Sequence, residues 1–482
     1  MPKLGAMFDA FVTFQARMKP RATAIVAPAR AATYGELEDD VNRLAAGLRG
    51  LGVTPARGAT ALRIGDPYLK HLAFLALARL GVVSAPADDA GADLELTDYD
   101  EPEAAGRILL KPAWIAAVFA AEPRPVTPVR GPPETVIRVM LSSGSTRAPR
   151  RVAKTWRSME SSALTVGTSY LSGKGGLWIA TTGLDSMLGQ NFAITAWAIG
   201  AAVGVGFAVE DLGVRLDEVA PTVLGMTPVQ LQMMLTWLPK DLRPLPDLRI
   251  ITGGSGLSPA VAKATRLRLT PDLMVAYGAT ECGAVSMGDA SVLDQAAGAT
   301  GYLHPDAEVE ILDADGRPLA PGEPGEVRIR NPRLATGYIG DPEASAGAFR
   351  DGWFHPGDVG RLLPSGVLVI DGRTDERMIV NGRKFLPNLL EEVALAVPGV
   401  VDCAAFAVPD AAGHDICWLA AVTAEGFNRA TLAAAIAAKG DSLPPVRFAW
   451  TDAIPRNAMG KIERTRLREE ALAVLRGGAA RP

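Results

Sequence analysis

This sequence has few histidines and cysteines, and it has no large excess of positive or negative charge. Among 482 residues there are four histidines and three cysteines, Cys282, Cys403 and Cys417. So few cysteines exclude a disulfide framework, and the scattered histidines lack the spacing of a zinc site. The 49 Lys and Arg residues nearly balance 53 Asp and Glu, for a net charge of −4. A nucleic-acid-binding chain would be more basic. We therefore expect a reduced, cytoplasmic enzyme with no nucleic-acid partner.

Long uncharged runs are also rare. The longest that we consider, Phe192 to Val209, has 18 residues and lies at the lower limit for a membrane span. Glycines interrupt its second half, where alternating valines suit a strand, and no cluster of Lys or Arg flanks it. We expect a buried helix followed by a buried strand, and no membrane span. The N-terminus shows neither an uninterrupted apolar run nor a small-residue cleavage site, so no signal peptide is expected.

Helix and strand signals alternate over the first three hundred residues. Apolar residues recur at three- and four-residue steps in Tyr34–Leu51, before Gly52, and His71–Leu80 indicates a second helix with His71 on its surface. Residues 87–135 are rich in Pro, Asp and Glu and are expected to form a partly irregular connection. Short apolar runs that indicate strands lie at 136–141, 177–180, 203–209, 222–225 and 248–252. This alternation predicts an α/β sheet covered by helices.

The sequence pattern changes further along the chain. Short strands separated by Gly- and Pro-containing turns predict a β-rich subdomain at about 298–372. The charged stretch GRTDER follows, and after it helices (388–396 and 431–439) mix with strands (403–408 and 416–422). We predict a large multi-subdomain N-terminal α/β domain, residues 1–374, and a small mobile α+β C-terminal domain, residues 375–482.

The first motif with chemical character is LSSGSTRAPRR, Leu141 to Arg151. Small hydroxyl residues around a glycine, after an apolar strand, give a loop whose N–H and O–H groups can surround phosphate oxygens. Arg147, Arg150 and Arg151 supply positive charge. The nucleotide loop G-x-x-x-x-G-K-[ST] is absent from the sequence. A polar surface turn remains an equal alternative for this motif taken alone.

The second motif is AYGATECG, Ala276 to Gly283. Tyr277 offers a flat ring for a purine, Thr280 a hydroxyl for a phosphate, and Glu281 a hard oxygen ligand for Mg²⁺. A Thr-Glu pair is equally an ordinary helix start, so this motif alone is weak.

Two further motifs lie later in the chain. GWFHPGDVG, with GRTD after it, contains Asp358, which can accept hydrogen bonds from two ribose hydroxyls, and Arg373, which can reach the same sugar or a phosphate. PRNAMGKIER places Lys461 after a glycine in a loop. Taken singly, these residues are equally explained by turn chemistry, a surface salt bridge and a solvated lysine.

Taken in this order, the four motifs resemble those of the acyl-adenylate-forming superfamily. This superfamily comprises acyl- and aryl-CoA synthetases, luciferases and the adenylation domains of peptide synthetases. The likeness extends to TYGELEDDVNRLAAGLRGLGV, FLALARLGVVSAPAD, the run from GATGYLHPDAEVEILDADGRP to ATGYIGDP, and the run from GRTDERMIVNGRKFLP to PGVVDCAAFAVPD. It therefore covers almost the whole chain.

The resemblance implies two steps: ATP converts a carboxylate to an acyl-AMP with release of pyrophosphate, and a thiol then displaces AMP. It implies ATP and Mg²⁺ as cofactors, Glu281 as the Mg²⁺ ligand, and Lys461, Thr280 and Glu281 as catalytic residues. Thr280 and Glu281 would lie in an N-terminal AMP-binding domain, and Lys461 in the small C-terminal domain. The ATP- and AMP-binding residues that it implies are Ser143, Gly144, Ser145, Thr146, Gly254, Ser255, Gly256, Tyr277, Gly278, Thr280, Asp358 and Arg373.

The resemblance also implies a hinge at Asp375, about which the C-terminal domain would rotate between the two steps. An acceptor side at Gly382, Arg383 and Lys384 follows by inference, with solvated charges as an equal alternative. The substrate pocket that it implies includes Asp185, Ser186, Gly225, Ala279 and Cys282. Small residues such as Gly225 and Ala279 would leave room for the acyl group.

The sequence departs from the family pattern at several of these positions. Arg147 stands where the phosphate loop usually has glycine, and Arg150 where it has lysine. Asp185 could pair with the amino group of an amino acid substrate, but a cap on the following helix is the better interpretation. For Cys282, a packed thiol is favoured over a reactive one.

We expect a ligase that joins a small carboxylic acid to coenzyme A. A phosphopantetheinyl acyl carrier protein is the alternative acceptor, because GSTRAPRRVAKTWRSM is similar to bacterial acyl-carrier-protein synthetases. A third possibility is a catalytically weakened nucleotide-binding protein. A monomer or a homodimer is expected.

Overall fold

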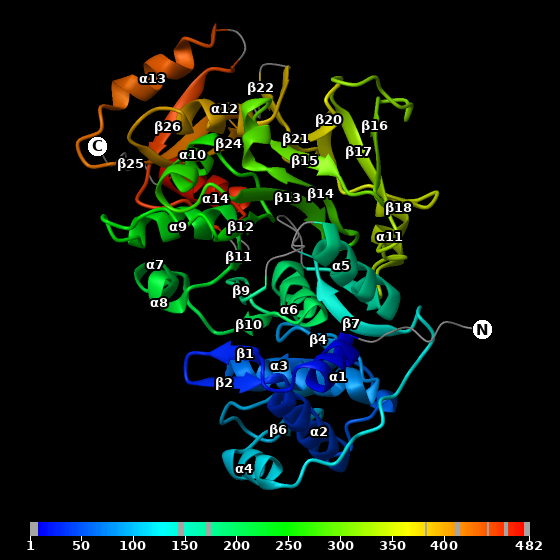
Figure 1. Ribbon diagram of the computed structural model, residues 1–482. Helices are drawn as coiled ribbons and strands as arrows, with labels where there is room; N and C mark the ends of the chain where they lie inside the picture. The colour runs from blue at the N-terminus through cyan, green and yellow to red at the C-terminus, as the bar shows by residue number, and fades with distance from the viewer. Residues whose placement is uncertain are drawn as a thin grey trace.

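The structure is a computed structural model and describes residues 8–142, 149–169, 175–380, 383–409, 415–440, 443–456 and 461–476 (Figure 1). Two large sheets with helices between and around them form the part before Arg373, and a three-stranded sheet with its own helices follows. The chain is therefore a mixed α/β protein, as the alternation of helix and strand signals predicted.

The larger sheet has 15 strands and changes character half-way across. Apart from the antiparallel edge strand β2 (Arg30–Thr33), neighbours in one half run parallel, and from β13 to β14 onwards they run antiparallel. The parallel strands are β1 (Thr23–Ala27), β10 (Ala202–Gly204), β9 (Leu177–Ala180), β11 (Val223–Met226), β12 (Arg249–Thr252) and β13 (Leu273–Ala279). The antiparallel strands beyond them include β14 (Gly283–Asp289), β15 (Ala299–Leu303), β21 (Val367–Arg373), β20 (Asp358–Leu362), β17 (Gly325–Arg330) and β16 (Glu308–Leu312).

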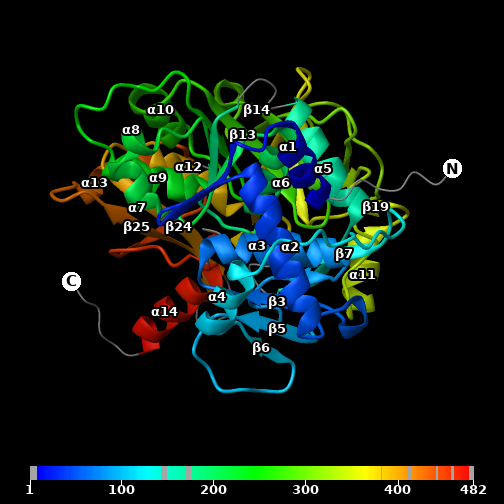
Figure 2. The same cartoon turned by 60° about the horizontal axis from the view of Figure 1, so that its bottom comes forward.

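The second sheet has the strand order β6-β5-β3-β4-β7-β8. Figure 2 shows β3, β5 and β6 side by side. Its last two strands form an antiparallel pair in which Leu141 faces Arg151. The strands are β3 (Thr60–Arg63), β4 (Ser84–Ala85), β5 (Leu94–Thr97), β6 (Arg107–Leu109), β7 (Val136–Leu141) and β8 (Arg151–Thr155). The connection between β7 and β8 is therefore the segment that holds the predicted phosphate loop.

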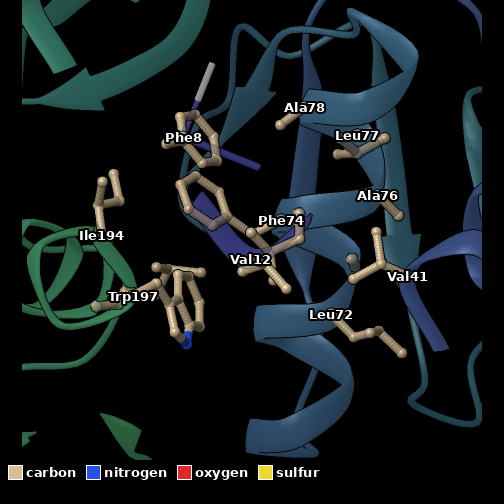
Figure 3. Packing of buried hydrophobic residues seen from close by; sticks show 14 of the residues in the cluster. Phe8, Val12, Val41, Leu72, Phe74, Ala76, Leu77, Ala78, Ile194 and Trp197 are labelled. Carbon is tan, nitrogen blue, oxygen red and sulfur yellow. The ribbon is translucent and has the colours of Figure 1, made fainter. Parts of the chain in front are cut away.

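The main core lies around α3 (Pro67–Leu80), which is buried along almost its whole length. Phe74 of this helix stacks on Phe8 of α1 (Phe8–Met18), with ring centroids 4.6 Å apart (Figure 3). α2 (Tyr34–Gly50) and α6 (Met187–Ile199) pack against the same cluster. A helix with apolar residues on all sides is buried on all sides. This burial places the core between the two sheets and holds them together.

His71 is a correction to the sequence interpretation. It lies on the buried α3, where its Nδ1 is 2.7 Å from the carbonyl of Pro67 and its ring meets the edge of Trp197. Burial lowers its pKa to about 4, so the imidazole is neutral at neutral pH. The expected surface position was wrong because the hydrophobic residues of α3 surround the helix and leave no polar face.

The uncharged run that begins at Phe192 forms a helix followed by a short strand, as predicted. The strand is shorter than expected. α6 ends at Gly200 in the left-handed conformation, and β10 covers only Ala202–Gly204. Gly206 has φ +74°, and α7 (Val209–Val214) begins three residues later, with Glu210 and Asp211 in its first turn. Acidic side chains stabilise a helix N-terminus, so α7 replaces the last residues of the expected strand. Across the described residues, no helix is long and apolar enough to cross a membrane.

Residues 87–135 hold more regular structure than the sequence indicates. β5 and β6 extend the second sheet, and α4 (Pro112–Ala120) packs against α2. The two strands have four and three residues, too few to show a repeating pattern.

The chain after Arg373 forms a smaller unit with two apolar clusters of its own. Its main sheet has the order β24-β25-β26, and β22 pairs with β23. The strands are β22 (Met378–Val380), β23 (Arg383–Phe385), β24 (Val400–Pro409), β25 (Asp415–Thr423) and β26 (Val446–Trp450), and the helices are α12 (Pro387–Leu395), α13 (Arg429–Ala437) and α14 (Arg464–Arg476). Gln232 of α9 (Pro228–Trp237) donates a hydrogen bond of 2.7 Å to the Val401 carbonyl, which joins this unit to the larger part. The predicted boundary at 374/375 stays a prediction.

Candidate active site

The candidate site lies where the parallel strands of the larger sheet end. The segments after β9, β11, β12 and β13 leave the sheet at the same edge, because neighbouring parallel strands end together. A hydrogen bond of 2.9 Å from the Thr181 N–H to the Gly225 carbonyl joins two of them. Ligands of α/β proteins bind at this carboxyl edge. The topology thus gathers the segments with Asp185, Gly254 and Thr280, which are far apart in sequence.

Asp358 and Arg373 face each other across β20 and β21. The Tyr277 hydroxyl donates to Oδ2 of Asp358 at 2.5 Å, and Nη1 of Arg373 donates to Oδ1 at 3.3 Å. Burial raises the pKa of Asp358, while the Tyr277 hydrogen bond and the Arg373 charge oppose this effect. Residues from two sequence motifs therefore form one cluster, which combines a flat ring, a carboxylate and a guanidinium.

Lys461, from the smaller unit, lies within electrostatic range of this cluster. Burial lowers the pKa of its ammonium, and the charge of Arg373 lowers it further. The charges of Asp358 and Glu281 act in the opposite direction. The structure therefore brings together charged residues of the second, third and fourth motifs at one place.

Glu281 lies in the tight turn between β13 and β14, so the alternative of a helix start at Thr280-Glu281 was wrong. Gly278 permits this hairpin, because a Cβ there would lie 2.3 Å from the Gly283 carbonyl oxygen. The Glu281 side chain is buried, and its Oε1 accepts a hydrogen bond of 2.9 Å from the Tyr338 hydroxyl. Thr280, beside it, is half-buried.

The chemistry of this carboxylate fits a magnesium ion. Mg²⁺ retains several waters and is usually held by one or two carboxylates together with substrate phosphates. Among the described residues no three His, Cys, Asp or Glu side chains are grouped as a metal site, so Glu281 is not part of an all-protein cage. A single buried carboxylate such as Glu281 fits this pattern of ligands.

The segment expected to line the adenine follows β12. Gly254 has φ +93°, which favours glycine, and a Cβ at Gly256 would meet no atom within 4 Å. Ser255 is half-buried between them. The segment is exposed enough for a planar group to lie against its backbone. Its role in binding adenine stays a prediction.

The predicted phosphate-binding residues Ser143, Gly144, Ser145 and Thr146, together with Arg147, lie outside the described residues. The base of the loop is described: the Ser142 N–H donates to the Arg150 carbonyl at 2.8 Å, and the Arg150 N–H to the Ser142 hydroxyl at 3.1 Å. The Arg150 guanidinium lies 5.0 Å from the centre of the Tyr338 ring and 3.6 Å from Asp341. Arg150 thus contacts Tyr338, the residue whose hydroxyl donates to Glu281.

In the expected substrate pocket, Asp185 and Ser186 have different roles from those considered. Ser186 caps α6, because its hydroxyl accepts from the Gly189 N–H at 2.9 Å, so Asp185 as the helix cap was wrong. Asp185 forms ion pairs with Lys70 at 2.5 Å and with the fully buried Arg138 at 3.3 Å. These two cations already neutralise its carboxylate.

Gly225 leaves less room than expected. A Cβ at Gly225 would lie 2.5 Å from the Phe192 ring, so this ring occupies the space that the glycine provides. Ala279 is half-buried at the end of β13. Cys282 is fully buried in an apolar cluster with Val285 and Leu368, and burial raises the pKa of its thiol to about 12. A packed, protonated thiol agrees with the favoured interpretation of Cys282.

At the expected hinge, Asp375 is exposed and pairs with Arg373 at 2.9 Å. On the expected acceptor side, Gly382 lies outside the described residues. Arg383 and Lys384 belong to β23, and only their backbone is described. Both assignments stay predictions.

Sequence reasoning gave no role to two residues that touch this site. Tyr338 contacts Glu281, and Lys154, fully buried on β8, donates to the Glu281 carbonyl at 3.4 Å. The only signal for Tyr338 is its place in ATGYIGDP, within the run that resembles the superfamily. For Lys154 the signal is a lysine in the alternating strand RVAKT, where the register gives it the same buried face as Val152.

The chain matches known proteins over most of its length. A family model described as AMP-binding enzyme matches residues 12–99 and 90–339. A fatty acid–[acyl-carrier-protein] ligase from Streptomyces coeruleorubidus is 26% identical over 95% of this chain and 95% of its own. A feruloyl-CoA synthase from an Amycolatopsis species is 29% identical over 93% of this chain and 96% of its own.

Solved structures match the fold. An anthranilate CoA ligase in complex with anthranoyl-AMP superposes with a TM-score of 0.85 at 20% identity, over 98% of each chain. An o-succinylbenzoate CoA synthetase from Bacillus subtilis, in complex with ATP and a magnesium ion, has a TM-score of 0.81 at 20% identity, over 95% of this chain and 98% of its own. At this identity the likeness establishes the fold.

Proposed function

This chain belongs to the family of AMP-binding enzymes, and on that premise we propose that it is an ATP- and Mg²⁺-dependent acid–thiol ligase. It would convert a small carboxylic acid to an acyl-AMP with release of pyrophosphate, and then transfer the acyl group to the thiol of coenzyme A. The observation that carries this proposal is that the half-buried Lys461 ammonium feels the charges of Glu281 and of the hydrogen-bonded pair Asp358 and Arg373, which come from separate motifs.

The first step needs charge neutralisation and alignment more than proton transfer. A carboxylate oxygen attacks the α-phosphorus of ATP, and the bond to the bridging oxygen of pyrophosphate breaks. Lys461 would place its ammonium between the two anions, and Thr280 would donate its hydroxyl to the α-phosphate. Mg²⁺, when bound at Glu281, supplies positive charge to the phosphate oxygens. Asp358 would accept hydrogen bonds from the ribose hydroxyls, with Arg373 beside them.

In the second step the thiol sulfur attacks the acyl carbon, the thiol gives up its proton, and AMP leaves. Lys461 is not required for this attack. If Asp375 is the hinge, the smaller unit would rotate about it, withdraw Lys461 and bring the β23 region to the acyl group. Asp358 and Arg373 would keep hold of AMP through both steps.

The ion pairs of Asp185 indicate which class of carboxylic acid the enzyme would accept as its substrate. A free carboxylate here would suit the amino group of an amino acid, but Lys70 and Arg138 already occupy this one. We therefore favour an acid without an α-amino group. The feruloyl-CoA synthase among the relatives makes aryl acids a suitable starting point.

The second candidate acceptor is the phosphopantetheine arm of an acyl carrier protein. Two observations favour it: one relative that aligns over 95% of this chain is a fatty acid–[acyl-carrier-protein] ligase, and the run from Gly144 to Met159, which includes most of the predicted phosphate loop, resembles such enzymes. Both acceptors offer the same thiol, so the first step is common to them.

The deciding experiment measures pyrophosphate release with ATP, Mg²⁺ and a panel of aryl, short, long and amino acids, with hydroxylamine to trap acyl-AMP. Release with a subset of the acids is expected, and no release with any of them would favour the weakened nucleotide-binding protein. Adding coenzyme A or a holo carrier protein, and following thioester formation by mass spectrometry, then identifies the acceptor.

A further inference from the structure

Tyr338 holds the carboxylate of Glu281 in the candidate active site. We propose that Tyr338 is a positioning residue that orients Glu281, so that its Oε2 faces the Mg²⁺–nucleotide complex. Arg150 supports it, since its guanidinium lies over the phenol ring. The inference rests on the proposed function only in that Glu281 is the metal ligand. Its test is metal–nucleotide binding, which needs no acyl transfer.

The contact between the two side chains is buried on both sides. The Tyr338 hydroxyl donates to Oε1 of Glu281 at 2.9 Å, and the two residues are 9% and 7% exposed. A hydrogen bond to a charged acceptor is worth about 1.5–3 kcal/mol, more than one between neutral groups. Since Oε1 is bound to the phenol, the carboxylate has one fixed orientation, and Oε2 is the oxygen left for a metal ion or its water.

The backbone of Glu281 is fixed by the segment that carries Tyr338. The Ala335 N–H donates to the Glu281 carbonyl at 2.9 Å, and Lys154 Nζ reaches the same oxygen at 3.4 Å. Asn331 Nδ2 donates to the Cys282 carbonyl at 3.0 Å. The hairpin turn is thus held by backbone as well as side-chain contacts. The hydroxyl of Tyr338 is the one group of this set that touches the carboxylate itself.

Tyr338 is in turn held by the strand that follows the phosphate loop. The Ile339 N–H donates to the Arg151 carbonyl at 2.8 Å, and Tyr338 pairs with Val152 in an isolated bridge. The Arg150 guanidinium lies 5.0 Å from the ring centre. A planar guanidinium stacks on an aromatic face as a lysine ammonium does not. This contact explains why an arginine suits the position where the family usually has lysine.

Removing the hydroxyl would leave a buried carboxylate oxygen without its donor. A group left unpaired in this way moves or recruits water, since its desolvation is otherwise uncompensated. Loss of an outer hydrogen-bond partner of a metal ligand typically weakens metal affinity by about 10- to 100-fold. Tyr338→Phe keeps the ring and its packing with Val152 and Ala335, so the change is confined to the hydroxyl.

The test is Mn²⁺ binding in the presence of ATP and absence of acid, followed by electron paramagnetic resonance of free Mn²⁺. Tyr338→Phe is expected to weaken Mn²⁺–ATP binding by about tenfold or more. Tyr302→Phe, an exposed tyrosine on β15, is the matched control and is expected to bind as the wild type does. Arg150→Lys, which loses the stacked plane, is expected to weaken binding by about two- to fivefold.

Equal Mn²⁺–ATP affinity in Tyr338→Phe and wild type would overturn the inference, as would an equal loss in Tyr302→Phe. Thermal melting followed by circular dichroism should show that Tyr338→Phe is folded. A variant that is folded and has a lowered affinity for Mn²⁺–ATP would support the inference. A wild type that binds Mn²⁺–ATP but releases no pyrophosphate with any acid would refute the proposed function and leave this inference standing.

Discussion

Charged residues of the candidate site are mostly paired with one another, and this pairing determines how each will respond to substitution. Asp358 accepts from both Tyr277 and Arg373, and Asp185 is shared by Lys70 and Arg138. A carboxylate with this many partners is oriented before a ligand arrives. Preorganisation of this kind lowers the entropy that binding must overcome.

We predict that Asp358→Asn weakens ATP binding by about tenfold or more, because a neutral amide accepts hydrogen bonds from the ribose hydroxyls less strongly than a carboxylate. Isothermal titration calorimetry with ATP measures the effect. Asp315→Asn, at an exposed turn, is the control and should bind ATP as the wild type does. Unchanged affinity in Asp358→Asn would remove Asp358 from the ribose site.

The sequence singled out Tyr277, Asp358 and Lys461 by the spacing of their motifs, and their roles stay predictions. The partners of those residues were not readable. Tyr338 and Lys154 reach Glu281 from segments 57 and 127 residues away, and no local pattern reports such contacts. The space beside Gly225 on β11 was misjudged for the same reason, because the Phe192 ring that fills it comes from α6.

At the scale of elements, α12 of the smaller unit contacts β21 of the larger part. Glu392 of this helix has its pKa raised to about 7, by burial first and then by the charges of Asp371 and Glu391, against the opposing charge of Arg361. Because the folded-state pKa lies above the unfolded one, the folded protein binds the extra proton. Stability from this group is therefore full below about pH 4.5 and is lost as the pH rises to about 7.

We predict that Glu392→Gln stabilises the chain at pH 8, by about 1 kcal/mol once partial exposure is allowed for, and has less effect at pH 5. Thermal unfolding of variant and wild type at both pH values measures this. Glu469→Gln, on the exposed face of α14, is the matched control and should show no such dependence. An equal effect of Glu392→Gln at pH 5 and pH 8 would contradict the assignment.

Helices and strands with a clear pattern of apolar residues were predicted well. α2 and the strands β7 and β9 lie within a residue of the expected ranges. The failures have physical causes: β5 and β6 are too short to show a period, and α7 begins where a valine-rich run continues. In that last case Gly206 and two acidic residues outweigh the strand propensity of Val209.

At the scale of the whole molecule, the site is assembled from two units. Glu281, Asp358 and Arg373 belong to the larger part, and Lys461 to the smaller. The arrangement described is the one that would perform the first step, since Lys461 lies close to the charged residues expected around the α-phosphate. The proposed rotation about Asp375 would give a second arrangement for the attack of the thiol.

We predict that Lys461→Ala slows acyl-AMP formation by about 100-fold or more, since it removes a charge aimed at the transition state. Thioester formation from supplied acyl-AMP should be largely retained. Single-turnover assays of each half-reaction separate the two, and Lys439→Ala, on an exposed lysine of the same unit, is the control. Equal loss of both half-reactions would argue against two arrangements.

If residues 375–482 form a tethered unit, as we predict, the tether sets the effective concentration of Lys461 at the rest of the site. A group on a unit joined by a short segment experiences its target at an effective concentration in the millimolar range. Cutting the chain near Asp375 would turn this intramolecular encounter into a bimolecular one. At micromolar protein, adenylation would then fall in proportion to the lost local concentration, although no side chain of the site had been changed.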